Sequence, residues 1–308
     1  MSTYLVTGGA GFIGSHLCDA LVAARHRVRV LDDLSTGRRE NLPPEAELIE
    51  GSVTDRALLG DALEGVAGCF HLAAIASVER GAREWLFTHQ TNLGGTVTLF
   101  EAIAGSGVSV PVVYASSAAV YGDPVTLPLA EEARTRPLSA YGADKLGSEL
   151  HAFVATHLHR IPTVGLRFFN IYGPRQDPRS SYSGVVAIFA ERLSNGEPIT
   201  IFGDGGQTRD FVFVADAVQA LLAAMTLAPP GAQVFNVCTG TGVSIQELAN
   251  DLGAIVGTAP TIRFAPARTG EIRHSVGASE ALRRVLGLGR PLPMRVGLTR
   301  LLAGQVAE

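Results

Sequence analysis

Two side chains with complementary proton chemistry, Tyr141 and Lys145, lie four residues apart in this sequence. In a helix, residues at this spacing lie on one face, so the phenol and the ammonium group would be neighbours. A phenol has a pKa of about 10 and is a poor base at neutral pH, but a nearby cation favours its ionised form. Ser117, after an apolar run, could hydrogen-bond the same substrate hydroxyl. The three are candidates for proton abstraction, although Tyr-x-x-x-Lys alone is also common on solvated helix faces.

A glycine cluster near the N-terminus is a second candidate site. Gly8, Gly9, Gly11 and Gly14 satisfy both the Gly-x-Gly-x-x-Gly pattern and its Gly-x-x-Gly-x-x-Gly variant. Glycines permit a tight turn and let the backbone approach a pyrophosphate, and the N-terminus of the following helix attracts phosphate charge. The cluster predicts a dinucleotide site. A tight strand–helix turn that binds no ligand is the alternative.

The acids Asp32 and Asp33 follow a predicted second strand, 18 residues after Gly14. A carboxylate at this place accepts hydrogen bonds from the adenosine ribose and repels a 2′-phosphate, so it favours NAD over NADP. Arg38 and Arg39 nearby keep NADP open, and an ordinary turn residue is the alternative for Asp32. The positive nicotinamide ring of oxidised NAD would further favour an ionised Tyr141.

Short apolar runs alternate with amphipathic segments over the first half of the chain. They predict strands at residues 4–7, 28–31, 47–50, 68–72, 110–115 and 163–168, and helices at 15–25, 55–64, 91–105 and 141–158. Strict alternation implies βαβ units with right-handed crossovers. We therefore predict an α/β protein with a Rossmann-like doubly wound parallel sheet and a smaller α/β lobe. Ligands of such sheets bind at the carboxyl ends of the strands.

The composition changes after Asn170, where segments rich in Gly, Pro and Ser begin. Further helices are predicted at 185–193, 215–225 and 245–256, with strands at 199–202 and 234–237. We expect a dinucleotide-binding Rossmann domain over residues 1–169 and a substrate-binding lobe over 170–308. Segments between about 210 and 240 are expected to return to the first sheet.

Composition excludes several classes of protein. The 308 residues are 46% hydrophobic and 18% charged, which does not fit a disordered chain. Three cysteines without a metal-binding spacing fit neither a disulfide framework nor a zinc site, so no metal is expected. A net charge of −4 disfavours nucleic acid, and no apolar stretch approaches the ~20 residues that span a bilayer. The N-terminus shows no secretion signal, so a cytoplasmic location is expected.

Several motifs occur in an order that resembles the extended short-chain dehydrogenase/reductase family over nearly the whole chain. They are residues 7–14, 32–37, 71–74, 116–122, 141–145, 167–170 and 203–210. The resemblance implies catalytic roles for Tyr141, Lys145 and Ser117, NAD held tightly through turnover, and a UDP-sugar bound by the second lobe. It also implies cofactor contacts from Gly8, Gly11, Phe12, Ile13, Gly14, Asp32, Asp33, Leu34, Ser35, Thr36, Gly37, Ser52, Val53, Leu72, Ala73, Ala74, Ala76, Asn92, Ala115, Tyr141, Lys145 and Phe168.

The residues after Ser117 narrow the activity that the resemblance implies. Similar sequences that dehydrate or decarboxylate sugar nucleotides carry an acid there, whereas this chain has Ala118 and Ala119, which cannot transfer protons. We therefore expect NAD-dependent C4 epimerisation of UDP-glucose and UDP-galactose through a 4-keto intermediate, extending to UDP-GlcNAc and UDP-GalNAc. The alternatives are a UDP-glucuronate 4-epimerase, a sugar-nucleotide reductase or dehydratase, and a non-catalytic dinucleotide-binding protein.

Substrate contacts also follow from the resemblance. Arg209 and Arg268 match arginines that clamp the diphosphate, and Glu271 matches an acid on the uridine ribose. Ser275 stands where a tyrosine closes the sugar pocket in enzymes restricted to UDP-glucose, which leaves room for a 2-acetamido group. The implied substrate-binding residues are Ser117, Tyr141, Asn170, Val185, Ile201, Phe202, Arg209, Arg268, Glu271 and Ser275.

Structural alternatives stay open for these positions: surface salt bridges for the two arginines, a turn for Asn170 and a polar loop position for Ser275. A homodimer is also implied, in which the predicted helices at 91–105 and 141–158 pair across a two-fold axis.

Overall fold

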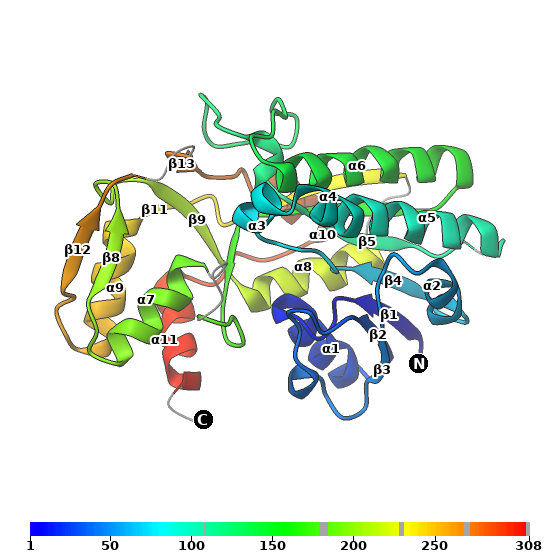
Figure 1. The fold of residues 1–308 in the computed structure, drawn as a ribbon, viewed down its shortest axis with the longest axis horizontal. Coiled ribbons are helices and arrows are strands. Elements are labelled where there is room, and N and C mark those ends of the chain that lie inside the picture. The colour runs from blue at the N-terminus through cyan, green and yellow to red at the C-terminus, as the bar shows by residue number, and fades with distance from the viewer. Residues whose placement is uncertain (108, 179–183, 228–230, 268–271, 306–308) are drawn as a thin grey trace.

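A seven-stranded parallel sheet lies at the centre of the computed structural model, which describes residues 1–107, 109–178, 184–227, 231–267 and 272–305. The spatial order is β3-β2-β1-β4-β5-β6-β10, of which Figure 1 labels β1 to β5. The strands are β1 (Thr3–Thr7), β2 (Arg27–Asp32), β3 (Glu47–Glu50), β4 (Gly68–His71), β5 (Val112–Ser117), β6 (Thr163–Phe168) and β10 (Ala232–Val237). The chain order runs outward from β1 in both directions, so the predicted doubly wound Rossmann-like fold is confirmed.

Helices cover both faces of this sheet. One face carries α1 (Phe12–Ala23), α8 (Val214–Leu227) and α10 (Glu280–Leu286), and the other carries α2 (Arg56–Leu63), α5 (Gly95–Ser106) and α6 (Ala140–His159). Leu17 and Leu221 belong to the first core, and Phe100 and Ala155 to the second. Because both faces of the sheet are covered, β4 and β6 are buried at every residue, and their few polar side chains, such as Arg167, are buried as well. The sequence signal was therefore strongest for the strands of this sheet.

Polar caps fix where the helices begin. The Asp55 side chain accepts hydrogen bonds from the Ala57 and Leu58 N–H groups at the start of α2. Ser139 accepts from the Gly142 N–H group at the start of α6, the helix that carries Tyr141 and Lys145. A cap of this kind stabilises a helix by about 1 kcal/mol.

A smaller lobe lies beside the carboxyl edge of the sheet, at the left of Figure 1. Its central strand, β9 (Thr208–Phe213), pairs with β7 (Asn170–Tyr172), β11 (Gly242–Ser244) and β13 (His274–Ser275), while β8 (Ile199–Phe202) pairs with β12 (Ile262–Ala265). The helices α7 (Val185–Ser194), α9 (Ile245–Val256) and α11 (Met294–Gln305) pack around these strands in a third core.

Two segments from the second half of the chain belong to the first sheet, since α8 covers one of its faces and β10 forms one of its edges. The strand β9 lies between residues 210 and 240 for part of its length, yet it pairs only within the smaller lobe. We keep the domain boundary at residue 169 as a prediction.

Two short helices lie close to the start of α6. The short helices α3 (Val78–Arg83) and α4 (Trp85–His89) pack against it, followed by a π-helical turn, Gln90–Gly94, where the sequence predicted an unbroken helix. The 3₁₀ turns are Arg39–Asn41 and Ala118–Tyr121. Within the described ranges, no helix combines the length and the apolar character that crossing a membrane requires.

Candidate functional site

A cleft of about 790 Å³ opens at the carboxyl ends of the central strands. It is lined by the segments that follow β1, β2, β4, β5 and β6, and also by the start of the smaller lobe. Because the strand order reverses between β1 and β4, this is the switch point at which doubly wound sheets bind ligands. The glycine cluster and the Tyr141–Lys145 pair, predicted independently, meet in this single cleft.

Steric contacts explain why Gly8 and Gly14 of the loop must be glycine, whereas Gly11 borders open space. Gly8 has φ +70°, and a Cβ there would lie 2.6 Å from the Ala73 backbone nitrogen. A Cβ on Gly14 would lie 2.2 Å from the Gly8 carbonyl oxygen, so α1 packs against the loop only because residue 14 is glycine. A Cβ on Gly11 would meet only that oxygen, at 3.3 Å, and would otherwise point into free space. Gly11 therefore keeps the cleft open at the N-terminus of α1.

The N-terminus of α1 suits a pyrophosphate. Gly11 is the N-cap residue and provides no side-chain cap, so the first-turn N–H groups are not occupied by a side chain. Unpaired amide groups and the helix dipole together form an anion site. The residues present thus fit the diphosphate of a dinucleotide.

Asp32 is rigidly held at the end of β2. Its two carboxylate oxygens accept hydrogen bonds from the Ala10 and Leu34 N–H groups, each at 2.9 Å. Burial raises the pKa of Asp32, and these two hydrogen bonds oppose the rise. Arg38 and Arg39 are paired with acids, Asp177 at 2.9 Å and Glu50 at 2.8 Å. Because the Asp32 carboxylate at this position would repel a 2′-phosphate, the site favours NAD over NADP.

Tyr141 and Lys145 project from the first turns of α6 into the cleft, as their spacing predicted. The Lys145 Nζ atom lies 5.8 Å from the centre of the Tyr141 ring and donates a hydrogen bond to the Ala115 carbonyl oxygen at 2.8 Å. Ser117 ends β5 and lines the same part of the cleft. Its Oγ atom accepts a hydrogen bond from the Ala119 N–H group.

Burial controls the ionisation of these groups. Burial raises the pKa of Tyr141, and a hydrogen bond from Ser117 has the smaller, opposite effect. Burial lowers the pKa of Lys145 to about 8, and the charge of Asp144 has the smaller, opposite effect. Burial, and then the Lys145 charge, lower the pKa of His71 to about 3, so this imidazole is neutral. Burial outweighs the hydrogen bond from Ser117, so the pKa of Tyr141 is raised overall. Ionising this phenol therefore needs positive charge close to it, such as that of the nicotinamide ring.

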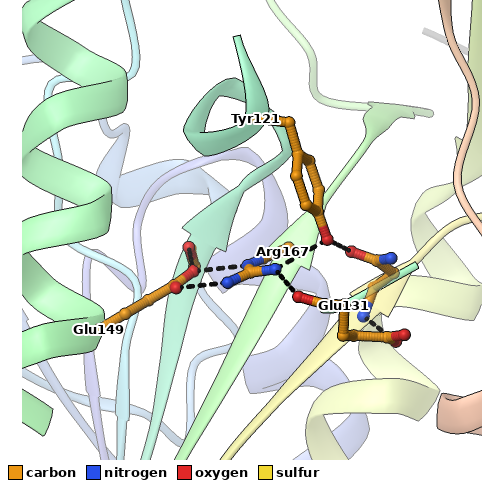
Figure 2. Close-up of polar contacts among 6 residues, drawn as sticks. Tyr121, Glu131, Glu149 and Arg167 are labelled. Atoms are coloured by element: carbon orange, nitrogen blue, oxygen red, sulfur yellow. Dashed lines mark hydrogen bonds and ion pairs between the residues drawn. The ribbon is translucent and has the colours of Figure 1, made fainter. Parts of the chain in front are cut away.

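A buried network of polar side chains surrounds Arg167, next to the strands and the helix that carry Ser117 and Lys145 (Figure 2). Arg167 on β6 forms a two-pronged ion pair with Glu149 on α6, at 2.7 and 2.8 Å. Arg167 Nη1 also donates to the Tyr121 hydroxyl and the Glu131 carbonyl oxygen, each at 2.8 Å. The Ser116 hydroxyl donates to the same Glu149 carboxylate. The network therefore ties together the segments that carry Ser117, Lys145 and the end of β6.

Most predicted cofactor residues line the cleft, but two do not. Asn92 is buried and holds the loop after β4, with its side-chain amide hydrogen-bonded to both backbone groups of Ile75. The Ser52 hydroxyl hydrogen-bonds Thr54. The predicted residues that line the cleft are Gly8, Gly11, Phe12, Ile13, Gly14, Asp32, Asp33, Leu34, Ser35, Thr36, Gly37, Val53, Leu72, Ala73, Ala74, Ala76, Ala115, Ser117, Tyr141, Lys145, Phe168 and Asn170.

The predicted substrate residues are more dispersed. Asn170 lines the cleft, and Val185 starts α7 next to the lining residue Gly184. Ile201 is 1% exposed in the core of the smaller lobe, and Phe202, next to it, ends β8. Arg209 and Ser275 are register partners on β9 and β13, so these two lie side by side. Arg268 and Glu271 lie outside the described residues.

Further residues that the sequence did not single out also line the cleft. Arg175, Gln176 and Asp177 enter it from the loop after β7, where Arg175 forms an ion pair with Asp19 at 2.8 Å. The sequence alone could have pointed to Lys145 in one further way. Lys145 is the only lysine in the chain, and all the other Lys and Arg residues are arginine. A chain that uses arginine everywhere else has kept lysine at this single position.

The arrangement is suited to moving one proton at a hydroxyl group. The acids in the cleft lining, Asp32, Asp33 and Asp177, belong to the β2 and β7 loops, whereas Ala118 and Ala119 follow Ser117. In the part of the chain that the structure describes, no group of three or more His, Cys, Asp or Glu residues could hold a metal ion.

Comparison with known proteins agrees with this geometry. Residues 4–238 match the NAD dependent epimerase/dehydratase family, and the chain belongs to this family. It is 40% identical to a UDP-glucose 4-epimerase of Mycolicibacterium smegmatis, over 96% of each chain. The UDP-glucose 4-epimerase of Thermotoga maritima, solved with UDP-glucose, is 36% identical with a TM-score of 0.94, covering 99% of this chain and 100% of that one. A UDP-N-acetylglucosamine 4-epimerase of Methanobrevibacter ruminantium, solved with UDP-N-acetylmuramic acid, is 32% identical with a TM-score of 0.94, covering 99% and 98%.

Proposed function

We propose that this protein is an NAD-dependent 4-epimerase of UDP-hexoses that interconverts UDP-glucose and UDP-galactose. The observation that carries the proposal is the placement of Tyr141, Lys145 and Ser117 in the same cleft as the uncapped glycine loop. The relatives named as UDP-glucose 4-epimerases, which match almost the full length of the chain, support this substrate class.

The cofactor residues that we propose are those of the cleft lining. The N–H groups at the start of α1 hold the diphosphate, and the carboxylate of Asp32 receives the adenosine ribose hydroxyls. When bound, NAD supplies the hydride acceptor and donor. Ser52 and Asn92 stay weaker candidates for direct contact, because their side chains are occupied with Thr54 and Ile75.

Tyr141 is the proposed base and acid. Its ionised phenolate oxygen takes the proton from O4 of the hexose, while the Ser117 hydroxyl hydrogen-bonds the same O4 oxygen. The Lys145 ammonium group stabilises the phenolate charge of Tyr141. After the 4-keto sugar has turned over in the site, the proton returns from Tyr141 to O4 in the opposite configuration. This scheme moves one proton and needs no further acid.

The second candidate within the family is a sugar-nucleotide dehydratase. Eliminating water from a 4-keto sugar needs an acid and a base at the neighbouring carbons, and the alanines at 118 and 119 provide neither. This absence after Ser117 favours epimerisation. A non-catalytic nucleotide-binding protein would not need a buried lysine beside a buried tyrosine, because burying an ammonium group costs stability.

We propose that UDP-GlcNAc and UDP-GalNAc are also substrates, since Ser275 is small and its register partner on β9 is Arg209, a proposed diphosphate ligand. A matched pair of variants tests this. Ser275→Tyr should abolish turnover of the N-acetyl sugars and spare UDP-galactose, whereas Ser275→Ala should keep both activities. Equal loss of both activities in the tyrosine variant would contradict the proposed gate.

We also propose a homodimer and a cytoplasmic location. The outer face of α6 carries an apolar stripe of Leu150, Phe153, Val154 and Leu158, exposed at 46–64%, and α5 packs alongside it (Figure 1). Apolar side chains at this helical spacing indicate a helix–helix contact, and a second copy of the same chain can satisfy it by two-fold symmetry.

The test of the proposed function is an assay of the purified protein with UDP-galactose and no added NAD. We expect UDP-glucose to form, because the cofactor stays bound. Tyr141→Phe removes the hydroxyl and keeps the ring, so it should reduce turnover by about 10²–10⁴-fold while NAD stays bound. A 4-keto-6-deoxy product would favour the dehydratase instead, and near-normal turnover by the phenylalanine variant would exclude Tyr141 as the base.

A further inference from the structure

Asp210 on β9 is fully buried, at 0% exposure, and has no part in the scheme above. Its Oδ1 atom accepts hydrogen bonds from the N–H group and the hydroxyl of Thr239, both at 2.7 Å. Its Oδ2 atom accepts from the N–H groups of Gly240, at 2.9 Å, and Gly277, at 3.3 Å. A buried carboxylate is costly unless hydrogen bonds replace its hydration, and here each oxygen receives two.

The four donors fit a carboxylate and no amide. An ionised carboxylate only accepts hydrogen bonds, through both of its oxygens. An asparagine side chain has one accepting oxygen, and its NH₂ group would face donors that it cannot pair with. The arrangement therefore requires an acid at position 210.

The donors belong to two segments that are far from β9 in the sequence. Thr239 and Gly240 lie between β10, an edge strand of the central sheet, and β11, whereas Gly277 follows β13 of the smaller lobe. The close approach at Gly277 needs a glycine, because a Cβ there would lie 2.6 Å from the Cys238 Sγ atom. Asp210 therefore joins β9 and the segment after β13 to the end of the central sheet.

Three strands that meet beside Asp210 each carry one proposed substrate residue. Arg209 precedes Asp210 on β9, and Ser275 on β13 is the register partner of Arg209. Asn170 on β7 is the register partner of Phe211, the residue after Asp210. Consecutive residues of a strand point to opposite faces, so Asp210 is buried on the face opposite to Arg209. The hydrogen bonds of Asp210 thus fix the strands that carry all three residues.

We propose that Asp210 is a positioning residue that holds β7, β9 and β13 in the arrangement that binds the UDP-sugar. This inference rests on the proposed function, which places the UDP-sugar at these strands. Asp210 does not touch the substrate in this account. Without its hydrogen bonds the ligand would have to order the strands, and its apparent affinity would fall with the fraction of molecules that keep the binding arrangement.

Calorimetric titration of the NAD-saturated protein with UDP tests this proposal. Asp210→Asn should weaken UDP binding by about tenfold or more, because an NH₂ group replaces an accepting oxygen at a buried site. The matched control is Glu197→Gln, which changes an exposed acid of the smaller lobe and should leave UDP affinity unchanged. NAD affinity should stay unchanged in both variants, because the proposed contacts of its diphosphate and adenosine ribose belong to the loops after β1 and β2.

A smaller change covers the case in which the asparagine variant does not fold. Thr239→Val keeps the size of the side chain and the N–H donor but removes the hydroxyl donor, so it should weaken UDP binding about threefold. Its control is Thr241→Val, which removes a hydroxyl from an exposed residue of the same segment and should leave UDP affinity unchanged.

Wild-type UDP affinity in a folded Asp210→Asn variant, or in Thr239→Val if the asparagine variant does not fold, would overturn the proposal. An equal loss of UDP and NAD affinity would also overturn it, because a merely structural role would not single out UDP. In turnover, KM for UDP-galactose should rise while kcat changes little, since Ser117, Tyr141 and Lys145 lie on β5 and α6. A wild-type protein that binds UDP but does not epimerise UDP-galactose would contradict the proposed function, yet the UDP titration would still decide the role of Asp210.

Discussion

At the scale of one residue, Lys145 shows that a side chain kept for function can lower the stability of the fold. Its folded-state pKa of about 8 lies below that of a lysine in an unfolded chain, so the folded protein binds this proton less tightly. Burial of the ammonium group therefore costs stability below pH 8, and the cost fades as the pH rises toward 10.5. The protein retains this cost beside Tyr141, as expected for a site residue.

Replacing Lys145 by methionine should stabilise the protein and inactivate it. The pKa difference corresponds to about 3 kcal/mol at pH 7, and loss of the hydrogen bond to Ala115 offsets about 1 kcal/mol. We therefore expect a net gain of about 2 kcal/mol at pH 7 that shrinks as the pH approaches 10, measured by urea unfolding of nucleotide-free protein. A methionine variant that is less stable at pH 7 would show that the ammonium group is better solvated than its burial indicates.

At this scale, the sequence predicted what local spacing determines. The pair at 141 and 145 meets because a helix places i and i+4 together, and Asp32 follows a strand end. The partners Glu149–Arg167 and His89–Asp144 could not be predicted, because they are 18 and 55 positions apart and meet only through tertiary packing. The cofactor contacts that the resemblance implies for Ser52 and Asn92 stay predictions, and in the structure their side chains hydrogen-bond Thr54 and Ile75.

At the scale of elements, two glycines at the junction of β1 and α1 have different roles: we expect Gly11 to matter for NAD binding and Gly14 for folding. Gly11→Ala meets only one atom, at 3.3 Å, so we expect near-normal stability and a loss of NAD affinity of roughly tenfold or more from a methyl group in the phosphate cradle. Gly14→Ala should instead destabilise the fold, because its Cβ would lie 2.2 Å from the Gly8 carbonyl oxygen. Calorimetric NAD titration and urea unfolding of both variants separate the two effects.

The control for this pair is Gly60→Ala on α2, where an added Cβ meets nothing within 4 Å. It should raise stability by up to about 1 kcal/mol through helix propensity and leave NAD affinity unchanged. Similar NAD affinity in the Gly11→Ala variant and the wild type would argue against binding of the NAD diphosphate next to Gly11.

The network behind the site makes a second prediction about elements. Glu149→Gln leaves Arg167 buried without its charged partner and should cost about 3–5 kcal/mol of unfolding free energy. Glu50→Gln breaks the exposed pair with Arg39 and should cost less than about 1 kcal/mol. Urea unfolding measures both. Equal effects would mean that the buried pair does not hold α6 against β5 and β6.

Among the elements, the strands of the central sheet were predictable and those of the smaller lobe mostly were not. The central strands β4, β5 and β6 are almost entirely buried and contain short apolar runs, because both faces of the sheet are covered. By contrast, β7, β11 and β13 are two or three residues long and depend on β9, a partner 30 or more positions away. Such pairings are set by the assembled lobe and leave no periodic pattern in the sequence.

At the scale of the whole molecule, the proposed dimer follows from the stripe on α6. Phe153→Glu places a charge at its centre and should convert a dimer into a monomer in sedimentation velocity. Val125→Glu changes an even more exposed apolar side chain away from the stripe and should stay dimeric. A wild-type protein that sediments as a monomer would contradict the dimer.

The whole molecule combines a sheet that binds a dinucleotide with a smaller lobe beside the carboxyl edge of that sheet. In the proposed chemistry, a hydride passes from C4 of the sugar to NAD and back to C4 within the cleft. UDP-[4-²H]galactose incubated with the purified enzyme, without added NAD, tests this most directly. The account predicts UDP-glucose that retains the deuterium at C4. Deuterium lost to solvent, or no epimer at all, would contradict it.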